Sequence, residues 1–209
     1  MNRTCACLTS AMLSLSPFAG YAAERCPQAG DVKGAGVVVG FSDGSRVVYS
    51  AHSDPQRMVE VNLLPDTASD FWVESWLGVY PLADGRVRRG APDRTYFAQS
   101  IYPTPLEELP APAPGVSWSG VLKEVDSRGA ALGQTSLTVK FGGQRPLVIG
   151  GCAYQAIQIE TLFADAEGGF QGTLDYLPDL GISIQTAGGD LGDLLDFYLP
   201  VSIGLASQD

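Results

Sequence analysis

The sequence predicts a mainly β protein, folded as an antiparallel sandwich or a strongly curved sheet, and three observations carry this prediction. Short runs of β-branched and aromatic residues recur along the chain. Clusters of Gly, Pro, Asp and Ser separate these runs. Helical periodicity is almost absent. Alternating apolar runs bounded by turn residues are typical of antiparallel strands.

The first half contains the clearest hairpin. Two β-branched runs flank Ser42-Asp43-Gly44, and an Asp-Gly pair between such runs favours a tight turn. A second turn is expected over 81–87, which reads PLADGRV. The strands expected on either side of these turns cover 36–41, 45–51, 57–63, 70–80 and 94–102.

A proline-rich stretch, 103–115, divides the strands into two groups. It holds five prolines, and proline has no backbone donor, so an interior strand is excluded there. An extended path along the surface is expected, either as a crossover within one domain or as a linker between two. The strands expected after it cover 116–125, 135–142, 146–150, 152–163, 170–177 and 181–187.

One short C-terminal helix is expected over 188–200, with Asp190 as its N-cap and Pro200 as its end. A faint similarity also links 59–81 to 157–178, since both read as a β run, an acidic turn, an aromatic residue and a closing proline. Two related β halves would produce this pattern, and so would any two hairpins of similar length.

The N-terminus has the layout of a secretory signal peptide over 1–22. Arg3 supplies the positive charge, and an apolar stretch follows. Small residues then indicate cleavage after residue 22 or 23. The remaining residues, 23–209, are enough for a single β domain with its own core. No later stretch is long and apolar enough for a membrane helix, so we expect a periplasmic or secreted protein.

Two of the four cysteines, Cys26 and Cys152, fall in the mature chain. A single pair in an oxidising compartment is most simply a disulfide. Cys152 lies in an alternating run in which Tyr154 and Ala156 share its side. We therefore expect Cys152 to be the inner end of a cross-link that fixes the N-terminal segment to a half-buried strand.

Charge and residue types exclude several classes of function. Removal of Arg3 leaves 12 basic residues against 23 acidic ones, a net charge of −11, which repels nucleic acid. His52 is the one histidine, so zinc and His-dependent catalysis are poorly supported. The acidic run at Asp190, Asp193 and Asp196 is better explained as a cap and a solvated face than as a calcium site. We expect no metal and no cofactor.

Two groups of residues are candidates for binding. Trp72, Glu74 and Trp76 share one face of an expected strand, which is the layout of a sugar-stacking platform. Phe71, Val73, Ser75 and Leu77 form the more apolar opposite face, so partial exposure of the tryptophans is expected, with ordinary packing as the alternative. Four arginines of an expected hairpin could bind an anion, or they form a solvated tip; they are Arg86, Arg88, Arg89 and Arg94.

Residues 150–184 combine a Cys-x-Tyr strand with a Tyr-x-Pro-x-Leu-Gly turn that leads into another strand. This segment resembles uncharacterised exported proteins of alphaproteobacteria, and it is superficially similar to envelope β proteins whose curved sheets face lipid or lipoprotein cargo. The resemblance covers about 35 residues and implies an exported β-sheet protein. It implies no catalytic residue.

These observations together favour a non-enzymatic, exported protein that binds or organises a protein, glycan or lipid partner in the envelope. The first alternative is a carbohydrate-binding or carbohydrate-cleaving domain that uses Trp72, Glu74 and Trp76. The second is a carrier of an apolar ligand held inside a curved sheet.

Overall fold

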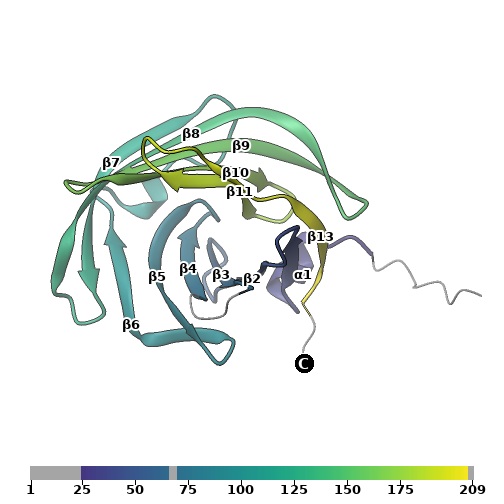
Figure 1. Cartoon of the computed structure of the whole chain (residues 1–209), viewed down its shortest axis with the longest axis horizontal. Coiled ribbons are helices and arrows are strands. Elements are labelled where there is room, and N and C mark those ends of the chain that lie inside the picture. Colours follow the sequence, from purple (N-terminus) through teal and green to yellow (C-terminus); the bar gives the residue numbers. More distant parts are fainter. Residues whose placement is uncertain (1–24, 66–69, 207–209) are drawn as a thin grey trace, which may run out of the picture.

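The computed structural model describes residues 25–65 and 70–206, so the predicted signal peptide lies outside the described residues. All strands in this part of the chain join one antiparallel sheet, and the mainly β prediction is confirmed (Figure 1). In chain order the elements are α1 (Ala29–Lys33), β1 (Val37–Phe41), β2 (Arg46–Ala51), β3 (Arg57–Leu63), β4 (Phe71–Trp76), β5 (Tyr80–Arg88), β6 (Ala91–Ile101), η2 (Leu106–Glu108), β7 (Ser117–Asp126), β8 (Ala131–Ile149), β9 (Cys152–Ala164), β10 (Gly169–Leu177), β11 (Ile182–Asp190), β12 (Asp196–Phe197) and β13 (Pro200–Leu205).

The sheet is a continuous meander with one exception at its end. Its order is β12-β11-β10-β9-β8-β7-β6-β5-β4-β3-β2-β1-β13, so neighbours in sequence are neighbours in space except for β13. This last strand pairs with β1, with Leu205 opposite Val37 and Ile203 opposite Val39. Strands β12 and β13 are therefore the two edges of a sheet that does not close by hydrogen bonding.

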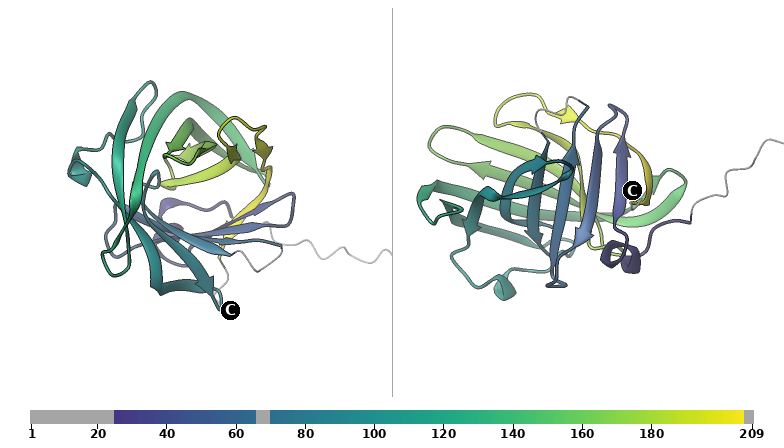
Figure 2. Two further views of the ribbon diagram at one scale, coloured as in Figure 1. Left: turned by 60° about the vertical axis from the view of Figure 1, so that its left-hand side comes forward. Right: turned by 90° about the horizontal axis from the view of Figure 1, so that it is seen from below.

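Strong curvature brings the two ends of the meander over each other, and the core lies between them. Strands β8–β11 lie above β2–β5 in Figure 1, and the right-hand view of Figure 2 shows the first strands running across the later ones. One core cluster joins β1 and β2 to β9 and β11, and a second joins β5 to β7–β9. Of the two predicted architectures, the curved sheet is the one observed.

A bulge in β8 helps this curvature. Phe141 pairs with Ile159, but Gln144 pairs with Ile157, so β8 carries one extra residue around its two glycines. An extra residue bends the strand locally. Opposite this bulge the burial alternation of β9 shifts by one residue. The buried side chains are Cys152, Tyr154 and Ala156 before the shift, and Ile157 and Ile159 after it.

The predicted cross-link is present. Cys26 and Cys152 form a disulfide with their Cα atoms 5.5 Å apart, and it holds the segment before α1 against the start of β9. The Tyr154 hydroxyl donates a hydrogen bond to the Pro27 carbonyl at 3.2 Å, and Val32 of α1 is buried in the same core. The N-terminal segment is thus fixed by covalent, polar and apolar contacts together.

The C-terminal helix predicted over 188–200 is wrong. Gly188 and Gly189 belong to β11 and pair with Gly172 and Gln171 of β10, so the backbone there is already used by the sheet. Leu194, in the middle of this segment, is 96% exposed. Without a buried apolar face, a short polar helix has little to stabilise it.

The proline-rich stretch joins β6 to β7, which are neighbours in the sheet. It contains the short η2 helix, and it is tied to the core by Leu109, which is buried, and by Pro110, whose carbonyl accepts a hydrogen bond from the Tyr80 hydroxyl at 2.9 Å. The stretch therefore connects adjacent strands of one sheet. The proposed relation between 59–81 and 157–178 stays a prediction.

Candidate functional site

The predicted tryptophan platform lies on β4, but it is not exposed. Trp72, Glu74 and Trp76 are 0%, 5% and 3% exposed, respectively. Trp72 packs against Phe97 of β6, with ring centroids 6.1 Å apart, and it lies opposite Val61 of β3. The expectation of partial exposure is wrong, because Phe97 and Arg94 of β6 cover Trp72 and Glu74, whereas Trp76 belongs to the core cluster that joins β5 to β7–β9. Ligand binding by these three residues stays a prediction that the geometry does not favour.

Glu74 is instead the centre of a charged cluster. Arg57 donates a hydrogen bond to one carboxylate oxygen at 3.0 Å, and Arg94 donates to the other at 2.8 Å. The Arg94 guanidinium also lies 4.1 Å from the centre of the Trp72 ring. Burial raises the pKa of Glu74, but the two guanidinium groups outweigh it, and the pKa is lowered below its ordinary value.

We expect Glu74→Gln to lower the free energy of unfolding at neutral pH by about 2 kcal/mol, because the neutral amide loses the ion pairs and can accept a hydrogen bond from only one of the two guanidinium groups. Since the folded-state pKa is depressed, this stabilisation is present above the unfolded-state pKa and disappears as the pH falls through the folded one. Urea titrations at neutral and acidic pH measure both effects. Glu167→Gln, in an exposed turn, is the control, and equal stability of the two variants at neutral pH would contradict the prediction.

The four predicted anion-binding arginines are all exposed, and three of them come together. Arg88, Arg89 and Arg94 border an open depression of about 380 Å³, which Asp93 also lines. Arg86 lies earlier on β5 and pairs with Phe71 of β4. Because Arg94 is already bound to Glu74 and a carboxylate shares the depression, anion binding there stays a prediction.

The remaining catalytic and metal candidates are not brought together. His52 accepts a hydrogen bond from the backbone N–H of Asp54 at 3.1 Å, as in a local turn, and Cys152 is held in the disulfide. Among residues 25–65 and 70–206, no group of three or more His, Cys, Asp or Glu side chains is arranged to hold a metal ion.

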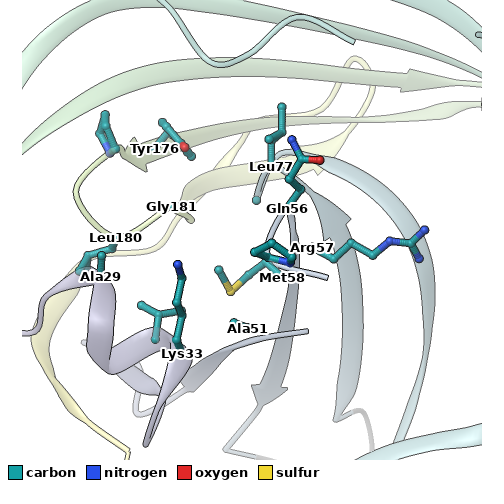
Figure 3. Close-up of a pocket in the computed structure, with 14 residues that line it drawn as sticks. Ala29, Lys33, Ala51, Gln56, Arg57, Met58, Leu77, Tyr176, Leu180 and Gly181 are labelled. Atoms are coloured by element: carbon teal, nitrogen blue, oxygen red, sulfur yellow. The ribbon is translucent and has the colours of Figure 1, made fainter. Parts of the chain in front are cut away.

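A first cavity lies beside α1, and we call it the helix cavity (Figure 3). It has a volume of about 230 Å³ and is bounded by α1, by the β3–β4 side of the sheet and by the β10–β11 turn. The Lys33 side chain points into it, near Met58 and Gly181, whereas Arg57 points away toward Glu74. The helix cavity is small for a ligand site, since such sites generally begin near 300 Å³.

A second cavity, which we call the sheet cavity, has a volume of about 360 Å³ and lies between β1–β4 and β10–β11. Phe71 and Phe170 line it from opposite sides and are partly exposed, so they mark its mouth, whereas Tyr49 is deeply buried. One wall includes Phe41, Val47, Tyr49, Leu64, Phe71 and Val73, together with the polar residues Asp43, Ser45, Arg46, Glu60 and Asn62. The facing wall consists of Phe170, Leu174, Ser183 and Gln185, with Tyr198 beside them.

The sheet cavity also has polar lining residues, and two of them, Glu60 and Ser183, are unusual. Glu60 of β3 lines the cavity between Tyr49 and Val73, its cross-strand neighbours. Burial raises the pKa of Glu60 to about 8. The Tyr49 hydroxyl donates to the Ser183 carbonyl at 2.8 Å, but the buried Ser183 Oγ has no hydrogen-bond partner among the described residues.

The sheet cavity is not predicted by the alternation of apolar and polar residues along β3. In the strand that contains Glu60, the alternation assigns Val59, Val61 and Leu63 to the core and Glu60 to solvent. Val61 does pack with Trp72, but the other face is enclosed as well, because β10 and β11 lie over it. The local signal is Glu60 itself, the one carboxylate inside the otherwise mainly apolar run 58–63, although alternation alone assigns it to solvent.

Comparisons with known proteins supply no family. No family model matches the chain, and no curated protein matches it. In the part of the chain that the structure describes, no helix has the length and apolar character to span a membrane.

Two solved structures are similar to the chain at low identity. The hypothetical lipoprotein YmcC of Escherichia coli K12 has a TM-score of 0.41 and 14% identity, over 82% of this chain and 87% of YmcC. A protein of Parabacteroides distasonis ATCC 8503, described as a candidate lipoprotein, has a TM-score of 0.37 and 11% identity, over 88% of this chain and 99% of its own. These scores are too low to carry an inference about function, and neither bacterium tests the alphaproteobacterial resemblance.

Proposed function

We propose that this protein is an exported binding protein that holds a small, mainly apolar molecule in the sheet cavity. The observation that carries the proposal is the cavity itself, which aromatic and aliphatic side chains of both layers line. Such a concave apolar site with a few placed polar groups is the usual form of a small-molecule site. The disulfide supports a compartment outside the cytoplasm.

The volume limits the size of the ligand. At roughly 30 Å³ for each water-sized group, 360 Å³ holds on the order of 12 non-hydrogen atoms. This matches a short alkyl chain or a single ring system better than a two-chain lipid or a glycan chain. Of the functions expected from the sequence, the carrier of an apolar ligand is therefore the one that the geometry favours.

We expect octan-1-ol to bind at one site in isothermal titration calorimetry, and Val73→Trp to weaken this binding by about tenfold or more. Val73 lines the cavity, so a larger side chain fills the space that the ligand needs without displacing a packed neighbour.

Val121→Trp is the matched control, because Val121 is exposed on β7 and does not line the cavity. It should bind octan-1-ol like the unchanged protein, and both variants should unfold at similar urea concentrations. Unchanged binding by Val73→Trp, or no binding by the unchanged protein, would refute the proposal.

A further inference from the structure

Glu60 is placed to contact a ligand in the sheet cavity. It lies in the middle of β3, directly opposite Tyr49 of β2 and Val73 of β4, and all three line the cavity. Side chains at directly opposite positions of neighbouring strands project to the same face. The Glu60 carboxyl group therefore belongs to the cavity wall and does not lie on the outer surface.

The carboxyl group has no partner among the residues that the structure describes. Across 25–65 and 70–206, no hydrogen bond and no ion pair involves the Glu60 side chain, in contrast to Glu74 on the next strand, which binds two arginines. The other charged or titratable groups that line the cavity are Asp43, Arg46, Tyr49 and Tyr198. Arg46 is exposed, and the Tyr49 hydroxyl donates a hydrogen bond to the Ser183 backbone carbonyl.

A second polar group in the same cavity is also unpartnered. The Ser183 hydroxyl oxygen is buried without a hydrogen bond among the described residues. Buried polar groups are normally hydrogen-bonded, and an exception calls for an explanation. A carboxyl group and a hydroxyl group without hydrogen-bond partners in one cavity match a ligand head group that donates several hydrogen bonds, and the amides of Asn62 and Gln185 line the same cavity.

An ammonium group has this chemistry. It carries three hydrogen-bond donors and a positive charge. A positive charge close to a carboxylate stabilises the ionised form in apolar surroundings. The acidic chain, with a net charge of −10, further favours a cation over an anion. On the basis of the proposed function, we infer that the ligand of the sheet cavity is a small apolar amine whose ammonium group pairs with Glu60.

The pairing has a measurable consequence for protons. With a pKa of about 8, Glu60 is about 0.9 protonated at neutral pH when the cavity is empty. An alkyl ammonium ion keeps its own proton, because its pKa is close to that of lysine, about 10. Formation of the ion pair therefore transfers the Glu60 proton to the buffer, whereas binding of an alcohol transfers none.

The experiment compares octylamine, octan-1-ol and octanoate by calorimetry at neutral pH, each in two buffers with different ionisation enthalpies. For the unchanged protein we expect octylamine to bind at least about tenfold more tightly than octan-1-ol, with release of about 0.9 proton. Glu60→Gln should remove both the preference and the proton release while it keeps octan-1-ol binding. The exposed Glu167→Gln control should behave like the unchanged protein.

The outcomes separate this inference from the proposed function. If no probe binds the unchanged protein, the proposed function fails and the inference fails with it. If octan-1-ol binds, three results would refute the inference alone. They are octylamine binding no tighter than octan-1-ol, octylamine binding without proton release, and octylamine binding more weakly than octanoate. The same holds if Glu60→Gln keeps the preference for octylamine.

Discussion

Removal of the Cys26–Cys152 disulfide is expected to lower the free energy of unfolding by about 5 kcal/mol. The two cysteines are 126 residues apart, and a cross-link over such a loop removes much of the conformational freedom of the unfolded chain. Loss of the bond also releases the segment that contains α1, whose Val32 is buried in the core. Urea unfolding of the oxidised protein and of a Cys26→Ser, Cys152→Ser double variant measures the difference.

Reduction of the unchanged protein is the matched control for this experiment, since it breaks the same bond without a change of sequence. The reduced protein should unfold at the same urea concentration as the double variant. Stability equal to that of the oxidised protein in both cases would show that the polar and apolar contacts of the N-terminal segment are sufficient without the disulfide.

Glu60 should make stability fall as the pH rises. Its pKa is raised from 4.5 in the unfolded reference to about 8 in the folded protein, so between these values the folded state binds the extra proton. The free energy of unfolding then decreases with pH across this interval, by about 5 kcal/mol in total, and is constant above it. Glu60→Gln has no proton to lose and should abolish this contribution.

Urea titrations at about pH 5 and about pH 9 test this prediction as a difference between proteins, because other groups also titrate. Glu60→Gln should be close to the unchanged protein at the lower pH and clearly more stable at the higher one. The exposed Glu167→Gln variant should follow the unchanged protein throughout. Parallel pH profiles for Glu60→Gln and the unchanged protein would contradict the assignment.

The strands and the disulfide could be predicted from sequence because they depend on local patterns. Alternation and turn residues define most strands, and the cysteine count leaves Cys26 and Cys152 as one pair. The order of the sheet also follows these local signals, since nearly every strand pairs with its neighbour in sequence. These features need no knowledge of distant contacts.

The failures depend on contacts that local alternation does not reveal, apart from one misplaced turn: 81–87 belongs to β5, and the turn lies at 77–79. Trp72 and Glu74 were expected to be partly exposed, because local alternation does not reveal that Arg94 and Phe97 of β6 cover them. Glu60 lies on the side of β3 that alternation assigns to solvent, but in the fold it lines the sheet cavity. The expected C-terminal helix was excluded by the pairing of Gly188 and Gly189 with β10. Burial of both faces of a strand is a property of the whole sheet.

The pairing of β1 with β13 has a consequence for the order in which the chain is made. Strand β1 is among the first segments to emerge, but its second partner, Pro200–Leu205, is among the last. Until then one edge of β1 carries unpaired backbone groups, and such an edge is open to association with other chains. The native sheet can therefore be completed only after synthesis has almost ended.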